Sequence, residues 1–290
     1  MSRIYDALKK LEAERAGRGK SNGGGTNGGN GGGNGSGNGH GGRGREGNGR
    51  RGWRPGWRWL FGNGKANGGA RIAFGARLGP DAEEAYQRLG TNLLVAPGSE
   101  ATPAPRLLGI TASRHGEGTS TTAAVFASIL ARRRGGRVAV VEANFRSPSF
   151  DTMFGIRRDS GLAELILGQK TLAEVAQPTE IPNLFAIGCG KPTLGPSALL
   201  DAPGVGPVLD QLRASFDFVI FDLPPATVYG DASILGPRLD AALIVIETDR
   251  TRVTDAERTR RSLERVGVKL AGLVLNRRRN HIPAFLEEML

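Results

Sequence analysis

Cysteine and long apolar runs are both scarce in this sequence. The single cysteine, Cys189, permits no internal disulfide bond, which is typical of a protein kept in a reducing compartment. No apolar run approaches the about 20 residues that a membrane-spanning helix needs, and the first residues lack the apolar core of a signal peptide. We therefore expect a cytoplasmic protein, with a peripheral position at the inner face of the plasma membrane as the alternative.

Acidic residues are almost missing from residues 16–70, and outside the short stretch 53–61 apolar residues are almost missing as well; nearly half of the positions are glycine, many in Asn-Gly repeats. Such a segment has no apolar surface to offset the entropy lost on ordering, so we predict a disordered linker. It contains one acid, Glu46, and nine basic residues: Arg18, Lys20, Arg43, Arg45, Arg50, Arg51, Arg54, Arg58 and Lys65. Most of the net charge of +11 therefore lies in the linker, which favours weak attraction to an anionic surface and argues against a nucleic-acid-binding domain.

Two short segments outside the predicted domain have sequences typical of segments that bind a partner or a membrane. Residues 1–15 place Ile4, Leu8 and Leu11 at helical spacing, which predicts an amphipathic helix that either docks on a partner or frays. All tryptophans lie in the motif GWRPGWRWLFG of the linker: Trp53, Trp57 and Trp59. Tryptophan interleaved with arginine is typical of an anionic membrane interface or a partner groove, although these rings can also pack on the domain.

The most informative stretch covers residues 107–124, LLGITASRHGEGTSTTAA. An apolar run precedes a turn with Gly116 and Gly118, and an alanine-rich helical segment follows, which is the strand, loop and helix order of a phosphate-binding loop. The hydroxyl of Ser120 occupies the place where such loops usually hold Mg²⁺. The lysine that normally precedes this hydroxyl is replaced by Thr119, so the loop lacks its fixed positive charge.

Other apolar runs predict strands at residues 137–143, 218–222, 241–247 and 270–276, separated by helical segments. This alternation predicts an α/β domain over residues 71–290, with a doubly wound, mostly parallel sheet and helices on both faces. Ligands of such sheets collect at the carboxyl ends of the strands. We therefore expect the phosphate loop, the segment 142–146 and Asp222 to converge on one phosphate and metal site.

Over residues 81 to about 284, the chain resembles the bacterial tyrosine kinases of capsule and exopolysaccharide assembly, which are related to the MinD/ParA-type ATPases. Several stretches carry the resemblance together: EAYQRLGTNL, GEGTSTTAA, VAVVEANFRSPSF, FGIRRDSGLAELI, PNLFAIGCGKP, PSALL, FDFVIFDLPP and VLNRRRNHIP. The family has three nucleotide motifs, which correspond to residues 116–120, 142–146 and 219–222. The resemblance implies a P-loop NTPase fold, ATP and Mg²⁺ as ligands, and a membrane-embedded polysaccharide co-polymerase, or chain-length regulator, as partner.

The resemblance also implies residue roles. The nucleotide is expected to contact Gly116, Glu117, Gly118, Thr119, Ser120, Thr121 and Arg146. The catalytic positions are Glu142, Asn144 and Asp222, and the metal is expected to lie near Ser120, Glu142 and Asp222.

Only the third motif is intact, because Thr119 replaces lysine while Glu142 and Asn144 replace two aspartates. The assembly motif Glu-x-x-Arg-x-x-Arg reads Glu84, Gln87 and Gly90, which makes a ring oligomer doubtful.

These departures lead us to expect a regulatory protein with lost or strongly weakened kinase activity, and with ATP and Mg²⁺ bound weakly or not at all. An active tyrosine autokinase is the alternative, with Arg114 replacing the lysine and Tyr5 or Tyr86 as acceptor, since no tyrosine follows Asn276. A third hypothesis is a MinD-like switch whose membrane or cargo binding follows its nucleotide state.

Overall fold

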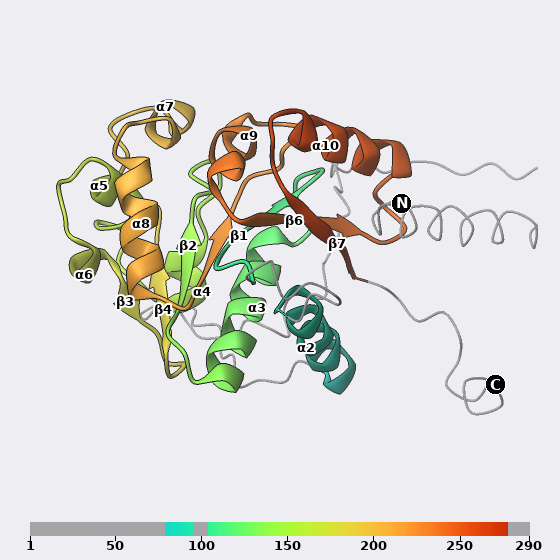
Figure 1. Ribbon diagram of the computed structural model, residues 1–290, viewed down its shortest axis with the longest axis horizontal. Helices are drawn as coiled ribbons and strands as arrows, with labels where there is room; N and C mark the ends of the chain where they lie inside the picture. Colours follow the sequence, from blue (N-terminus) through green and yellow to red (C-terminus); the bar gives the residue numbers. More distant parts are fainter. Residues whose placement is uncertain (1–78, 95–103, 278–290) are drawn as a thin grey trace, which may run out of the picture.

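The structure is a computed structural model that describes residues 79–94 and 104–277 (Figure 1). The predicted helix over residues 1–15, the linker over residues 16–70 and its tryptophans lie outside these described residues. The predicted domain over residues 71–290 contains both described ranges, and its boundaries stay a prediction.

Seven strands form one sheet in the order β3-β4-β2-β5-β1-β6-β7. Every neighbouring pair is parallel except the short edge strand β3, which runs antiparallel to β4. The strands are β1 (Leu107–Ala112), β2 (Val138–Glu142), β3 (Gln177–Pro178), β4 (Leu184–Ile187), β5 (Phe218–Asp222), β6 (Ala241–Glu247) and β7 (Leu270–Asn276). The predicted fold class, an α/β domain with a mostly parallel sheet, is confirmed.

Helices connect the strands and cover both faces of the sheet (Figure 1). They are α2 (Pro80–Leu94), α3 (Thr119–Arg134), α4 (Phe150–Phe154), α5 (Leu162–Ile166), α6 (Leu172–Val175), α7 (Pro196–Leu200), α8 (Val205–Ser215), α9 (Asp231–Leu235), η2 (Gly236–Arg238) and α10 (Val253–Arg265). Among the described residues, no helix is both long enough and apolar enough to cross a bilayer.

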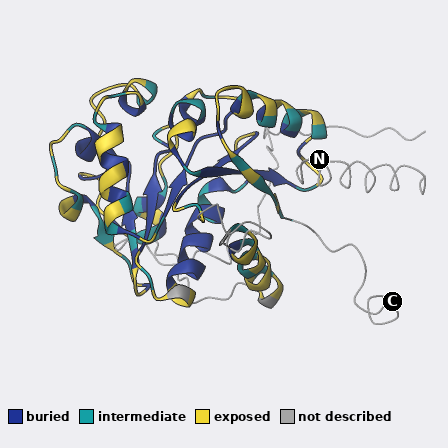
Figure 2. Cartoon of the chain, viewed as in Figure 1, coloured by how far each residue is buried: buried dark blue, intermediate teal, exposed yellow. Residues whose placement is uncertain are grey.

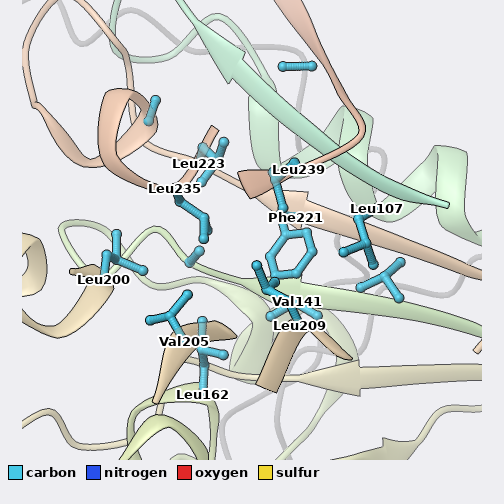
Figure 3. Packing of buried hydrophobic residues seen from close by; sticks show 14 of the residues in the cluster. Leu107, Val141, Leu162, Leu200, Val205, Leu209, Phe221, Leu223, Leu235 and Leu239 are labelled. Atoms are coloured by element: carbon cyan, nitrogen blue, oxygen red, sulfur yellow. The ribbon is translucent and has the colours of Figure 1, made fainter. Parts of the chain in front are cut away.

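Two apolar cores lie on opposite faces of the sheet, because successive strand residues point to opposite sides. One core joins the sheet to α5, α7, α8, α9 and α10, and Figure 3 shows Phe221 and Val141 of the strands among leucines of the helices. The other core joins the sheet to α2, α3 and α4 through Phe126 and Phe150, which are both fully buried. In Figure 2 the central strands are accordingly buried along their length.

Two details of burial differ from the simple pattern. Strand β7 is mostly half-buried rather than buried on both faces, because among the described strands it is an edge strand that pairs only with β6. In α2, Leu89 and Leu93 pack on the core as their spacing predicts, but Tyr86 joins them while Ala85 is exposed. Positions 86, 89 and 93 follow the i, i+3, i+7 spacing of one helix face, and position 85 begins the next face.

The strand order places the three motifs side by side. Strand β5 lies between β2 and β1, with Glu142 paired in register to Asp222 and Ile110 paired to Asp222 on the other side. The loop after β1 and the segment after β2 therefore both leave the sheet next to Asp222. The predicted convergence at the carboxyl edge is confirmed at the level of the backbone.

Candidate phosphate and metal site

The loop between β1 and α3 has the backbone shape of an anion cradle. Gly116 and Gly118 have φ angles of 82° and 93°, which L-residues with a side chain rarely adopt. Helix α3 begins directly afterwards at Thr119, so its first free N–H groups and its positive dipole end face the loop. This geometry fits a phosphate group.

The side chain of Glu117 braces the loop from inside. Its Oε2 accepts hydrogen bonds from the backbone N–H groups of Ser113 (2.8 Å) and Arg114 (2.9 Å), while its Oε1 accepts one from the Thr251 hydroxyl. The Asn276 side-chain amide donates to the Glu117 carbonyl at 2.8 Å. Because both oxygens of its carboxyl are engaged within the domain, Glu117 shapes the loop, and its backbone N–H is the part left for a ligand. Burial raises the pKa of this carboxyl.

Ser120 and Asp222 meet at the centre of the site. The Ser120 hydroxyl donates to Asp222 Oδ2 at 2.6 Å, although 102 residues separate them in the chain. Asp222 is fully buried, and its Oδ1 has no hydrogen-bond partner in the described structure. Burial, with a smaller effect of the nearby Glu142 charge, raises the pKa of Asp222 to about 8. A hydroxyl beside an unpartnered buried carboxylate oxygen fits the oxygen ligands that Mg²⁺ prefers.

The carboxylate of Glu142 accepts hydrogen bonds from three backbone N–H groups. Its Oε1 accepts from the N–H groups of Ser149 and Phe150, the latter at 2.8 Å, and its Oε2 accepts from Cys189 N–H at 3.2 Å. The two bonds to Oε1 cap the start of α4, and burial raises the pKa of Glu142. The structure thus brings Glu142 next to Asp222 but occupies its carboxylate, and its roles as metal ligand and catalytic group stay predictions.

The remaining second-motif residues face different partners. Asn144 is buried, and its Oδ1 accepts from Ser147 N–H at 3.3 Å. Arg146 forms an ion pair with buried Asp231 at 3.1 Å and lies over the Tyr229 ring, with Cζ 4.7 Å from the ring centre. The Tyr229 ring also lies near His115 of the phosphate loop, and the two ring centres are 5.4 Å apart.

Sequence reasoning missed Asp231 and Tyr229. Both residues lie fewer than ten positions after the intact third motif, and this closeness in the sequence is the signal that could have identified them.

The position of the missing lysine is filled by Thr119, which is buried at the first position of α3, while Thr121, two residues further on, is half-buried. Arg114 is the cation carried by the loop itself. Its side chain is 56% exposed, and its Nε lies 3.7 Å from Asp255 Oδ2. This exposed, long ion pair is weak enough to exchange for another anion.

The buried carboxyls predict that the domain loses stability as pH rises. For a carboxyl whose pKa is higher in the folded than in the unfolded state, the contribution to stability is fully present below the unfolded value of about 4. It is lost as pH rises toward the folded value, about 8 for Asp222, and Glu142 and Glu117 act in the same direction.

We expect a higher melting temperature at about pH 5 than at about pH 8 in magnesium-free buffer, measured by circular dichroism. Asp222→Ala, which removes the largest contributor, should flatten this dependence. A melting temperature that increases over this interval would contradict the assignment.

Comparisons with known proteins identify the family of the chain. The family model described as "ParA: NUBPL iron-transfer P-loop NTPase" matches residues 105–288. The tyrosine-protein kinase YwqD of Bacillus subtilis is 30% identical over 167 residues, which cover 58% of this chain and 70% of YwqD. The chain belongs to the bacterial tyrosine kinase family, within the ParA-type P-loop NTPases. The resemblance found in the sequence is confirmed.

One further curated kinase and two solved structures are also similar to this chain. The tyrosine-protein kinase CpsD of Streptococcus pneumoniae serotype 4 is 29% identical over 68% of this chain and 84% of its own length. The crystal structure of the chimerical protein CapA2B2 has a TM-score of 0.64 and 27% identity, covering 70% of this chain and 87% of that one. The protein MinD from Pyrococcus horikoshii, described as complexed with Mg-ADP, shares the fold at 19% identity and a TM-score of 0.51, over 63% of this chain and 76% of its own.

Proposed function

We propose that this member of the bacterial tyrosine kinase family is a regulator of exopolysaccharide or capsule synthesis and export whose phosphoryl transfer is lost or strongly weakened. It acts through a membrane-embedded polysaccharide co-polymerase. The single observation that carries the proposal is Thr119, a buried hydroxyl at the position where the phosphate loop needs a cation.

The size of the effect supports a loss of turnover. Removing one positioned donor at a charge that develops in the transition state costs about 3–4 kcal/mol. From a typical kinase turnover of about 1–100 s⁻¹, this cost alone, roughly 160- to 900-fold, leaves about 10⁻³ to 0.6 s⁻¹. The second motif lowers the rate further, because Asn144 is neutral and Glu142 is engaged by three backbone N–H groups.

Nucleotide binding is affected less than catalysis. The glycine turn, the N-terminus of α3 and the Ser120–Asp222 pair are all in place, and backbone N–H groups need no lysine to contact phosphate. We propose that ATP or ADP binds weakly with Mg²⁺ near Ser120 and Asp222. The metal, when bound, would neutralise phosphate charge, and this chain would supply the buried oxygens that hold it.

Arg114 favours a second candidate, an active tyrosine autokinase. The arginine is on the loop and is held only by a long ion pair, so it can turn toward a phosphate in place of the lysine. The phosphate acceptor argues against an autokinase, because Tyr86 is packed against the core and burial raises its pKa. The other acceptor that we considered, Tyr5, lies outside the described residues.

We further propose that the chain does not assemble into a ring. Gly90 is buried against α3, where a Cβ atom would lie 3.7 Å from side-chain atoms of Leu130 and Phe126. Gln87 contacts Glu83 on its own helix at 3.3 Å. Neither position offers the bidentate contact of an arginine. Attachment to an anionic membrane through Trp53, Trp57 and Trp59 remains a proposal from the sequence.

The test combines calorimetry with turnover on the full chain. We expect ATP binding that is weak and dependent on Mg²⁺, ATP hydrolysis below about 0.1 s⁻¹, and no phosphotyrosine after incubation with ATP. Turnover within the ordinary kinase range that disappears in Arg114→Gln would instead establish the autokinase. A matched control is Arg157→Gln, which removes an exposed charge outside the site.

A further inference from the structure

Helix α10 has two faces of different character. Its inner face consists of Ala256, Thr259 and Leu263, which are buried against the domain. Its outer face carries the arginine row, which we define as Arg258, Arg261 and Arg265, and all three are exposed. At 100° per residue these arginines lie opposite the buried residues. Figure 2 shows the exposed side of α10 turned away from the sheet.

The arginine row is only partly compensated by its own helix. Arg261 shares Glu257 with Arg260, whose other partner is Glu264. Within residues 79–94 and 104–277, neither Arg258 nor Arg265 forms an ion pair. The spacings of three and four residues place like charges next to each other, which is unfavourable for an isolated helix. The repulsion within the row costs stability, and Arg258 and Arg265 have no ion pair in the described domain that offsets it. This indicates that the row has a role outside the domain.

The helix is also fixed to the phosphate loop, so it presents the row as a rigid surface. Thr259 Oγ1 donates to Ser113 Oγ at 2.8 Å in a buried contact, and the Thr251 hydroxyl just before α10 donates to Glu117. Asp255 on the same helix lies 3.7 Å from Arg114. A ligand on the outer face therefore binds a helix whose inner face touches the nucleotide site.

We propose that the arginine row of α10 is a docking surface for an acidic segment of a partner protein. The row spans eight residues, a rise of about 10 Å along the helix, and matches two or three carboxylates on one face of a short segment, each of which arginine can bind in a bidentate way. A membrane surface fits less well, because Glu257 and Glu264 lie along one side of the row and would face anionic headgroups together with it. The proposal does not depend on whether the kinase activity is lost.

The test uses the full chain and a peptide of eight glutamates with a photoreactive benzophenone. Arg258→Gln, Arg261→Gln and Arg265→Gln together form the row variant, in which glutamine keeps good helix propensity. The matched control replaces Arg88, Arg157 and Lys191, which are exposed and lie outside the row, with glutamine for the same change in net charge. Circular dichroism checks that both variants fold. Cross-linked residues are then located by mass spectrometry, since the basic linker also attracts the peptide.

We expect cross-links within residues 253–266 that fall at least fivefold in the row variant and less than twofold in the control. Cross-links confined to residues 16–70, or equal losses in both variants, would overturn the proposal. If vesicles of phosphatidylglycerol bind the row and the peptide does not, the row would be assigned to a membrane surface. Labelling that appears only after removal of residues 278–290 would assign the row to the chain's own C-terminal acids.

Discussion

Replacing Thr119 with lysine is expected to raise the affinity for ATP at least about tenfold, which corresponds to about 1.4 kcal/mol. The gain should be large because the glycine turn and the start of α3 already have the shape that a phosphate needs. Calorimetry with and without Mg²⁺ measures it. Thr91→Lys adds the same charge at an exposed position of α2 and should leave the affinity within about twofold, because an exposed charge outside the site is screened by salt. An unchanged affinity in Thr119→Lys would show that another group already supplies the charge.

Phosphoryl transfer should not return with affinity alone. Asn144 carries no negative charge for a metal or a proton, so Thr119→Lys should bind ATP without turnover. Adding Asn144→Asp should produce slow hydrolysis, measured by phosphate release. Glu142 should not be shortened to aspartate in the same variant, because the shorter side chain cannot reach all three N–H groups that it accepts from, two at the start of α4 and that of Cys189. Turnover in the unmodified protein equal to that of the double variant would contradict the proposed loss of activity.

Glu142→Ala is expected to destabilise the domain by about 3 kcal/mol, since it leaves three backbone N–H groups without their acceptor. For a domain of this size the melting temperature should fall by roughly 6–12 °C. Chemical denaturation at about pH 5 measures the free energy of unfolding, because the contribution of a carboxyl with a raised pKa is lost as pH rises.

A matched control for this prediction is Glu174→Ala. Glu174 also caps a short helix, accepting from Thr171 N–H and hydroxyl at 2.7 Å each, but in an exposed position. Water can replace these bonds, so we expect a loss below about 1 kcal/mol. If Glu142→Ala is no more destabilising than this control, then Glu142 is not committed to capping α4 and is free to bind a metal.

Local patterns in the sequence determined the fold class and the phosphate loop. Strands β1, β2, β5 and β6 are continuous apolar runs because they are buried on both faces, and burial of this kind is visible in the residue types. The glycines of the loop are likewise a local requirement, set by φ angles at Gly116 and Gly118. The short strands β3 and β4 have too few residues to carry a period of their own, and the sequence analysis did not predict them.

Only the tertiary structure decided how the site residues are used. The sequence placed Glu142, Asp222 and Ser120 at one edge of a sheet, but not which groups each carboxylate meets. Glu142 became the cap of α4 because the chain after β2 brings the N–H groups of Ser149 and Phe150 to its first oxygen, while β4, which pairs with β2, brings Cys189 to its second oxygen. Asp222 acquired a raised pKa because strands on both sides exclude water from it. Hydrogen bonds and dehydration depend on neighbours that are distant in the chain, and a residue's own position in the sequence does not specify them.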